Sequence, residues 1–251
     1  VVIGVDPFPH SVYLIKAGGT FSREVRKTGD FEHWVMAGLA LPRRDMRVLD
    51  ARRINRLPDP EACAGVVMTG SHAMVTERLP WMERIAGWLR ELVAAEVPYL
   101  GICFGHQMLA QALGGRVDYH PGGREIGTVP IDLEPAAATD PLFAGMPTRF
   151  SAHAVHAQTV VDLPYGAVRL AGNRFEPTHA FRAGARAWGI QFHPEFNVER
   201  MAMYLEHLAP DLHATSRNIG AIYAGLAETP QAAGLLPRFA GLTRATGHNG
   251  D

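Results

Sequence analysis

The stretch Pro98–Gly115, PYLGICFGHQMLAQALGG, decides the fold. Its first part, Tyr99–Ile102, is a short apolar run typical of a buried parallel strand. Its second part, Phe104–Leu113, is predicted to form a helix that ends at the following pair of glycines. A parallel strand that leads directly into a helix is the repeating unit of a doubly wound α/β sheet, so this stretch indicates the fold class.

Cys103 lies on the turn between these two elements, in a G-x-C-x-G pattern with Gly101 and Gly105. A residue on so sharp a turn needs neighbours without side chains, because the backbone passes close to itself. The turn would place the sulfur at the carboxyl edge of the sheet, where α/β proteins bind ligands. The helix dipole would stabilise the thiolate, and the Phe104 N–H could donate to an oxyanion. The pattern favours a nucleophile and leaves a buried structural cysteine as the alternative.

The rest of the chain continues this alternation and then changes character. Further strands are expected over Ser11–Lys16, Met46–Leu49, Gly65–Thr69, Gly127–Leu133, Ala167–Ala171, His179–Arg182 and Ala187–Phe192. Further helices are expected over Phe31–Leu41 with Asp30 as its N-cap, Pro80–Ala95, Val198–Leu208 and Thr229–Leu242. The second half therefore adds short, partly antiparallel strands to a parallel sheet. Because no linker rich in proline, glycine and serine divides the chain, we expect one domain over residues 1–251 with a frayed tail over Thr243–Asp251.

The composition excludes several classes of protein. The 251 residues suffice to bury a full core, and a net charge of −1 gives no reason to expect nucleic acid or an anionic membrane as a partner. Two cysteines cannot build a disulfide framework, which favours a reducing, cytoplasmic location. Val1–Pro9 does not have the pattern of a targeting segment, and polar residues and glycines interrupt the uncharged run Val97–Gly115.

Neither a metal nor a nucleotide cofactor is expected. The twelve histidines are scattered, and neither cysteine has a C-x-x-C partner, whereas zinc needs three or four clustered ligands. The glycine pairs of Ala17–Thr20 and Pro121–Arg124 lack the phosphate-binding patterns. Cys63 precedes a predicted buried strand and is expected to be a small hydrophobic residue.

Two other segments carry partners for Cys103. In Gln191–Phe196, QFHPEF, residues His193 and Glu195 would share one side of an extended segment. Glu195 could then accept from one imidazole nitrogen of His193, while the other nitrogen faces Cys103. The stretch Thr69–Val75, TGSHAMV, follows a predicted strand. Its Gly70 and Ser71 could supply backbone N–H groups for the second half of an oxyanion hole.

The motifs TGSHAMV, PYLGICFGHQMLAQALGG and QFHPEF, in their order along the chain, closely resemble those of the class I (triad) glutamine amidotransferases. The resemblance is greatest to the amidotransferase domain of GMP synthase and its stand-alone relatives. The resemblance covers about residues 11–205. It implies a flavodoxin-like open sheet that is mostly parallel, with a small antiparallel addition. It assigns no role to the C-terminal extension over residues 206–242.

The resemblance also implies roles for residues. Cys103 would attack the side-chain amide of glutamine, His193 would act as base and later as acid, and Glu195 would orient His193. Gln107 matches a glutamine that helps to hold the substrate. The segment Val155–Val160, VHAQTV, matches a segment usually written Ser-His-x-Asp-x-Val. Its residues His156, Ala157 and Gln158 would line the substrate pocket. Two departures are Gln158 in place of Asp and Thr-Gly-Ser in place of Gly-Gly-Pro.

Three functions remain open at this point. The first is a glutaminase that passes ammonia to a separate, ammonia-accepting synthetase, because the sequence has no nucleotide-binding motif and no room after residue 205 for an ATP-using domain. The second is a stand-alone thiol hydrolase of γ-glutamyl peptides or amides, in which only the leaving group differs. The third is a non-enzymatic regulatory protein on the same scaffold, which the presence of Cys103, His193 and Glu195 disfavours.

Overall fold

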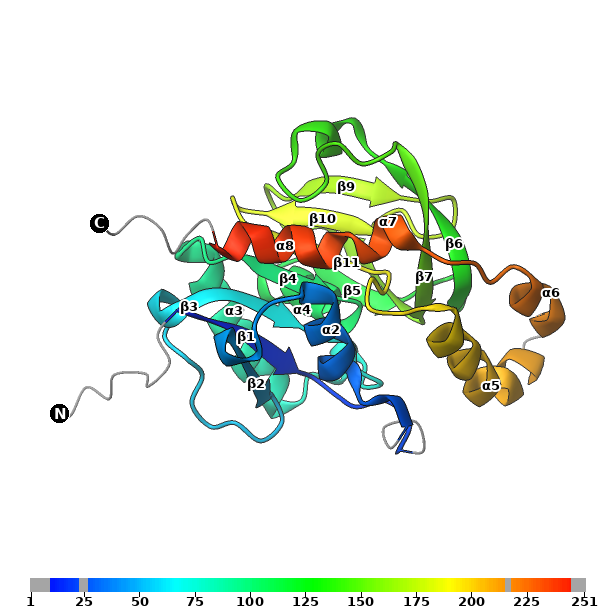
Figure 1. Ribbon diagram of the computed structural model, residues 1–251, viewed down its shortest axis with the longest axis horizontal. Helices are drawn as coiled ribbons and strands as arrows, with labels where there is room; N and C mark the ends of the chain where they lie inside the picture. Colours follow the sequence, from blue (N-terminus) through cyan, green and yellow to red (C-terminus); the bar gives the residue numbers. More distant parts are fainter. Residues whose placement is uncertain (1–9, 23–26, 215–217, 245–251) are drawn as a thin grey trace.

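The computed structural model describes residues 10–22, 27–214 and 218–244. Its strands are β1 (Ser11–Lys16), β2 (Met46–Asp50), β3 (Cys63–Met68), β4 (Tyr99–Ile102), β5 (Arg116–Tyr119), β6 (Glu125–Leu133), β7 (Arg149–His156), β8 (Gln158–Asp162), β9 (Val168–Gly172), β10 (Ala180–Ala183) and β11 (Ala187–Ile190). Its helices include α2 (Phe31–Leu39), α3 (Pro80–Ala94), α4 (Phe104–Ala112), α5 (Val198–Ala214), α6 (Ile219–Ala224), α7 (Pro230–Ala233) and α8 (Leu235–Arg244). Figure 1 shows their arrangement.

The main sheet of the described residues has the order β2-β1-β3-β4-β11-β10-β9-β6-β7. Neighbouring strands from β2 to β11 are parallel, and those from β11 to β7 are antiparallel. Strands β5 and β8 form a separate antiparallel pair. The sheet thus joins a parallel core to an antiparallel extension, and β11 stands at the junction.

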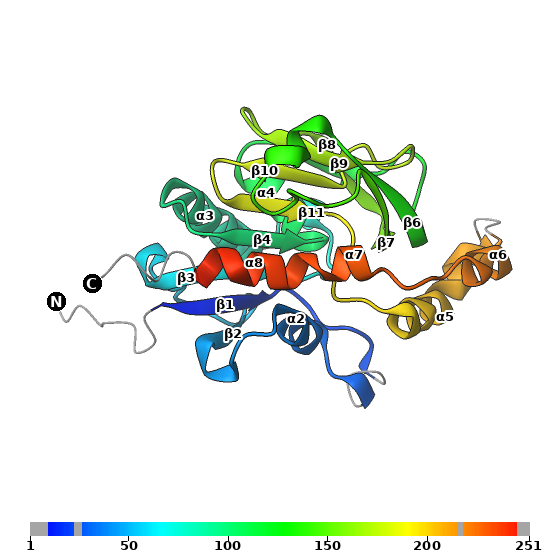
Figure 2. The same ribbon diagram turned by 45° about the horizontal axis from the view of Figure 1, so that its top comes forward.

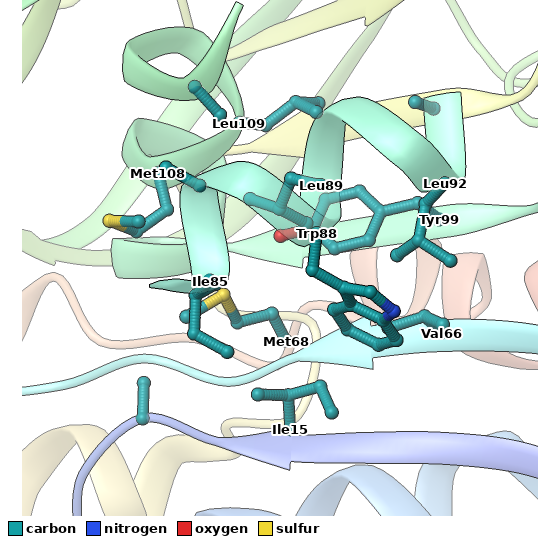
Figure 3. Close-up of a cluster of buried hydrophobic side chains, with 14 of the residues drawn as sticks. Ile15, Val66, Met68, Ile85, Trp88, Leu89, Leu92, Tyr99, Met108 and Leu109 are labelled. Carbon is teal, nitrogen blue, oxygen red and sulfur yellow. The ribbon is translucent and has the colours of Figure 1, made fainter. Parts of the chain in front are cut away.

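Helices cover both faces of the parallel core, which confirms the doubly wound α/β fold (Figure 2). Alternate residues of β1 point to opposite faces, as strand geometry requires. Tyr13 and Ile15 pack under α3 and α4, whereas Val12 and Leu14 pack with α2 and α8. Figure 3 shows the first of these layers, in which Trp88 and its neighbours on α3 cover the strands.

Several predicted elements match the structure closely, and local chemistry explains why. Strands β1 and β4 have the predicted bounds. Asp30 caps α2 as expected, because its Oδ1 accepts from Phe31 N at 2.8 Å. Lys16 lies at the end of β1, and its Nζ is 2.6 Å from Asp30 Oδ2 and 2.8 Å from Glu32 Oε1. These two ion pairs fix the start of α2 against the sheet.

Other elements differ from expectation. The antiparallel part is larger than predicted, because β5, β7 and β8 were not expected as strands. The expected helix over Thr229–Leu242 is divided at Gly234 into α7 and α8. The prediction of a frayed tail from Thr243 is wrong at its start, because Thr243 belongs to α8 and is buried against Gly65 of β3. The rest of that tail, residues 245–251, and the predicted absence of a targeting segment in residues 1–9 lie outside the described residues.

The C-terminal extension forms α5, α6, α7 and α8, and its parts do different things. α7 and α8 return over the sheet, whereas α5 and α6 project beyond it (Figures 1 and 2). α5 packs its buried Met201, Tyr204 and Leu205 into a cluster with Phe31 and Phe196. None of the helices among the described residues is both long enough and apolar enough to cross a membrane.

The packing of α3 on the sheet predicts a large loss of stability on truncation. Leu89 is 0% exposed and sits in the cluster between α3 and the sheet. We expect Leu89→Ala to lower the free energy of unfolding by about 3 kcal/mol, from lost burial and the cavity left behind. Leu79→Ala, at a residue that is 38% exposed, serves as the control and should cost less than about 1 kcal/mol. Urea unfolding measures both; equal losses would contradict the assigned packing.

Candidate active site

Cys103 occupies a strained turn between β4 and α4. Its φ of 50° and ψ of −97° place it where residues with a side chain are rarely found. A Cβ on Gly101 would lie 2.3 Å from the Gly105 carbonyl oxygen, and one on Gly105 would lie 2.6 Å from the Met68 carbonyl oxygen. Both flanking glycines are therefore required by close backbone approach. The Cys103 N–H donates to Ile190 O at 2.8 Å, which ties the turn to β11.

His193 and Glu195 follow the end of β11 and contact each other directly. His193 Nδ1 lies 2.8 Å from Glu195 Oε1, and both side chains are buried. The His193 N–H donates to His153 O of β7 at 2.8 Å, which fixes the backbone. β11 ends at Ile190, and His193 is a bridge residue followed by a turn. The predictions of a strand up to Phe192 and of an extended segment at His193 and Glu195 are therefore wrong. The turn, not strand alternation, brings the two side chains together.

Cys103 and His193 meet beside Gly70. A Cβ on Gly70 would lie 3.2 Å from His193 Cε1 and 3.9 Å from Cys103 Cβ, so both residues border the same glycine. With Nδ1 engaged by Glu195, the ring nitrogen left for the thiol is Nε2. This buried nitrogen has no hydrogen-bond partner within the described part of the chain.

The environment of His193 favours its protonated form. Burial by itself would lower the pKa of His193, but the neighbouring Glu195 carboxylate and the Cys103 sulfur act against it. Together they raise the pKa of His193 to about 10. The histidine therefore carries a proton at neutral pH.

The loop after β3 brings backbone N–H groups to the same edge of the sheet. Ser71 uses its hydroxyl elsewhere, since Oγ donates to Ala17 O at 3.2 Å and accepts from Ala73 N at 3.1 Å. The Ser71 hydroxyl is thus held by two backbone groups of the protein. Phe104 begins α4, so its N–H belongs to the first turn, where no carbonyl of the same helix can accept it.

A cavity of about 180 Å³ opens over these groups. Eight of the ten predicted site residues line it: Ser71, Cys103, Phe104, Gln107, His156, Ala157, Gln158 and His193. The other two do not line the cavity: Gly70 borders the ring of His193, and Glu195 orients that ring. No three His, Cys, Asp or Glu side chains among the described residues are grouped to hold a metal ion.

Two of the predicted substrate contacts have their polar atoms engaged within the protein. His156 has Nδ1 at 2.9 Å from Gln158 O and Nε2 at 2.9 Å from Glu125 Oε2. Gln158 accepts from Val75 N at 3.0 Å and donates to Thr76 Oγ1 at 2.6 Å. Both residues line the cavity, while these polar atoms are paired within the protein, as buried polar atoms usually are. Through these two bonds, the side chain of Gln158 joins β8 to the loop after β3.

Gln107 keeps one polar atom for the cavity. Its Nε2 donates to Gln158 O and to Gln191 Oε1, both at 2.9 Å. These bonds set the orientation of the amide, so its Oε1 is the atom that remains for a ligand.

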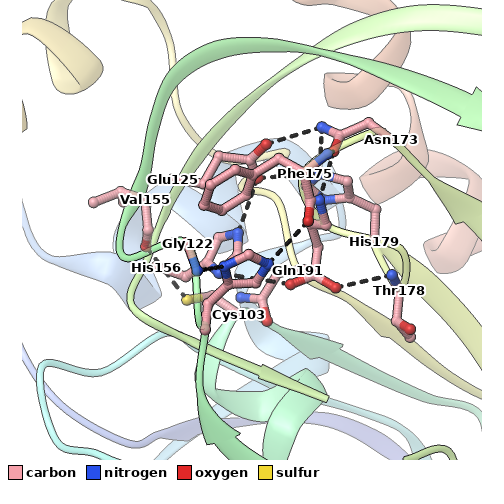
Figure 4. A network of polar contacts seen from close by, with 12 residues as sticks. Cys103, Gly122, Glu125, Val155, His156, Asn173, Phe175, Thr178, His179 and Gln191 are labelled. Atoms are coloured by element: carbon pink, nitrogen blue, oxygen red, sulfur yellow. Dashed lines mark hydrogen bonds and ion pairs between the residues drawn. The ribbon is translucent and has the colours of Figure 1, made fainter. Parts of the chain in front are cut away.

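A buried charged network lies behind His156 (Figure 4). Glu125 Oε2 lies 2.9 Å from His156 Nε2 and 3.1 Å from His179 Nε2, and Asn173 Nδ2 donates to Glu125 Oε1 at 2.9 Å. Burial would raise the pKa of Glu125, but the bonds from the two histidines outweigh it and hold the pKa well below its ordinary value. The network fixes the strand end that lines the cavity.

Sequence reasoning missed a set of residues that complete the cavity. They are Phe21, Phe31, His72, Ala73, Met74, Arg124, Val155, Tyr204 and Leu208. His72, Ala73, Met74 and Val155 lie inside the two segments already singled out, TGSHAMV and VHAQTV, but were not named as site residues. Phe21, Phe31, Arg124, Tyr204 and Leu208 come from the loops after β1 and β5 and from α2 and α5, and only the fold brings them to the cavity.

A match to a known family accounts for this arrangement. The family model described as "Glutamine amidotransferase class-I" matches residues 47–208, which include Cys103, His193 and Glu195. The chain belongs to the class I glutamine amidotransferase family. As an amidotransferase it is an amidohydrolase in type, and its sequence is GMP synthase-like.

Two relatives and one solved structure define the likeness. A GMP synthase (glutamine-hydrolyzing) of Thermomicrobium roseum is 37% identical over 131 residues, which are 52% of this chain and 23% of that protein. A GMP synthase (glutamine-hydrolyzing) subunit of Methanopyrus kandleri is 33% identical over 159 residues, which are 60% of this chain and 79% of that protein. The crystal structure of a glutamine amidotransferase from Thermotoga maritima is 24% identical, with a TM-score of 0.69 over 93% of this chain and 98% of that one.

The amidotransferase thus matches about a quarter of the length of the first of these relatives and most of the second. The solved structure shows the same α/β fold, with a parallel core and added antiparallel strands.

The raised pKa of His193 predicts how stability depends on pH in this amidotransferase. A histidine whose pKa is about 10 when folded and about 6.5 when unfolded stabilises the fold fully below pH 6.5. That contribution is lost as the pH rises through 10. We expect the stability advantage of the wild type over His193→Gln to shrink between pH 6.5 and pH 10, as measured by urea unfolding.

Glu195→Gln provides the control, because it removes the carboxylate that raises the pKa of His193. Its stability should show less of this decline over the same pH range. A wild-type advantage that grows with pH would contradict the assigned protonation of His193.

Proposed function

We propose that this amidotransferase hydrolyses the side-chain amide of glutamine to glutamate and ammonia through a γ-glutamyl thioester on Cys103. The observation that carries the proposal is the meeting of Cys103 and His193 beside Gly70, with His193 held by Glu195 at 2.8 Å. A thiol, an imidazole and an orienting carboxylate in this order are the parts of nucleophilic acyl transfer. The cavity above them holds the substrate.

In the proposed reaction, Cys103 Sγ attacks the γ-carbonyl carbon and the C–N bond breaks. The leaving nitrogen takes the proton that His193 carries at neutral pH and departs as ammonia. Water, deprotonated by His193, then attacks the thioester and releases glutamate. The N–H groups of Phe104, Gly70 and Ser71 stabilise the oxyanion in both steps. Gln107 Oε1 accepts from the α-ammonium group, and the backbone of Ala157 borders the glutamyl chain.

The ammonia is proposed to pass to a separate synthetase. The Methanopyrus kandleri relative is itself named as one subunit of GMP synthase, a name that implies another, and this chain covers 79% of it. Support also comes from chemistry, because free ammonia would be protonated and lost in water. Nucleic acid and membranes are not proposed as partners, and the proposed location is the cytoplasm.

The two cysteines provide a matched test of the nucleophile. Cys103→Ser should abolish ammonia release from glutamine, because a serine hydroxyl is a far weaker nucleophile than a thiolate in this setting. Cys63→Ser should leave it nearly intact, because Cys63 lies at the start of β3 in the hydrophobic core. Ammonia and glutamate release measure both. Full activity in the Cys103 variant would overturn the mechanism.

The link that Gln158 makes between β8 and the loop after β3 predicts a loss of turnover without a matching loss of substrate binding. Gln158→Leu removes both bonds to the loop that carries Ser71 and leaves the Val75 N–H without its acceptor. We expect kcat for glutamine to fall about tenfold or more, with KM changed less, because the loop positions oxyanion donors.

Thr76 supplies the matched controls. Thr76→Ser keeps the hydroxyl that accepts from Gln158 and should behave like the wild type, whereas Thr76→Val loses it and should show part of the Gln158→Leu effect. If Gln158→Leu is folded and retains full kcat, the hydrogen bonds of Gln158 do not position the loop after β3.

A further inference from the structure

The cavity over Cys103 has two chemically different sides. One side comes from α4 and from the β7–β8 segment, and it offers Gln107 and the backbone of residues 155–158. The other side, here termed the apolar wall, comes from four parts of the chain. It consists of Phe21, Phe31, His72, Tyr204 and Leu208. The proposed reaction uses the first side for the glutamyl part of the substrate and gives the apolar wall no role.

Phe196, which lies outside the cavity lining, connects His193 to the apolar wall. The ring of Phe196 stacks on His193 with centroids 4.2 Å apart, and Phe196 lies 5.1 Å from Tyr204. The ring centroid of Phe21 lies 5.1 Å from that of Tyr204 and 4.8 Å from that of His72. A run of ring contacts therefore links the proposed proton donor to the apolar wall. The leaving nitrogen must sit beside His193 to take its proton, and the apolar wall borders the same cavity as His193, so a group attached to that nitrogen has this wall within reach.

The hydroxyl of Tyr204 and one ring nitrogen of His72 are engaged within the protein. Tyr204 Oη lies 3.1 Å from His72 Nε2 and 3.1 Å from Thr20 Oγ1. Burial lowers the pKa of His72, so its ring is uncharged at neutral pH. Apart from His72 Nδ1, the wall therefore presents ring faces and carbon atoms to the cavity.

The charges around the cavity oppose a cationic leaving group. Among the described residues that line it, none is Asp or Glu, and Arg124 is the one with a permanent positive charge. A protonated amine on the leaving group would face Arg124 without a carboxylate to pair with. An uncharged hydrocarbon or aromatic group would instead bury its surface on the rings.

From this geometry we infer that the apolar wall is a leaving-group subsite, and that the enzyme cleaves γ-glutamyl amides of uncharged, apolar amines as well as glutamine. The inference rests on the proposed thioester chemistry and names a substrate class for it. Cys103 forms the S–C bond, the C–N bond breaks, and the amine R–NH₂ leaves with the proton from His193. Water then cleaves the thioester to glutamate and restores the thiol, as with glutamine.

The test compares N-benzyl and N-methyl γ-glutamyl amides, which share an alkylamine leaving group and differ by the ring. We expect kcat/KM for the benzylamide to exceed that for the methylamide by about tenfold or more, because the ring is buried on the wall. The γ-glutamyl amide of putrescine, with its cationic end, should be cleaved more slowly than the benzylamide. Released amine and glutamate are both measured.

Three variants locate the effect. Phe21→Ala should lower the benzyl-to-methyl ratio several-fold. Leu208→Asp should lower the same ratio and raise the rate for the putrescine amide, because it places a carboxylate on the wall. Tyr165→Ala, at an exposed aromatic residue outside the cavity, should leave the ratio unchanged. Thermal unfolding checks that each variant is folded, and the two wall variants act from different elements.

The possible failures can be told apart. If glutamine is hydrolysed but the benzylamide is cleaved no faster than the methylamide, the subsite inference is overturned and the proposed function stands. A ratio that neither Phe21→Ala nor Leu208→Asp changes also overturns the inference. If the wild type releases neither ammonia nor amine from any of these compounds, the proposed function falls, and the subsite falls with it.

Discussion

The close approach of Gly101 and Gly105 is the constraint on which the rest of the site depends. It lets β4 turn directly into α4, and it forces Cys103 into a backbone conformation that few residues with side chains adopt. The bond from the Cys103 N–H to Ile190 O then fixes the turn to β11. Because His193 follows β11 within three residues, the same bond sets nucleophile and histidine against each other.

Most of the charged groups near the cavity are buried, and their pairing gives the site its rigidity. Glu125 holds His156 and His179, and Glu195 holds His193. Removing one partner from such a pair leaves a buried charge without compensation, which is costly. The lining strands are therefore fixed by charge pairing as much as by packing, and Gln158 extends this order to the loop after β3.

The sequence was informative where the structural cause is local. The turn at Cys103, the cap at Asp30 and the strands β1 and β4 follow from neighbouring residues, so they could be predicted from the sequence. β7 was missed because alanines and histidines, not branched residues, occupy most of its inward positions. The protein partners of His156 and Gln158 could not be predicted, since Glu125 and Val75 are distant from them in the chain. The contact of Thr20 with Tyr204 joins residues 184 positions apart, beyond any local pattern.

The apolar wall extends beyond the part of the chain that matches the family. The turn at Cys103 and the β7–β8 side of the cavity lie within residues 47–208, as do His72, Tyr204 and Leu208, whereas Phe21 and Phe31 precede that part. Substitutions on the outer wall can change which compounds the enzyme accepts without disturbing the strained turn or the charge pairs. A library restricted to this wall would therefore explore substrate range on a fixed catalytic scaffold, much as exchangeable loops do in other α/β enzymes.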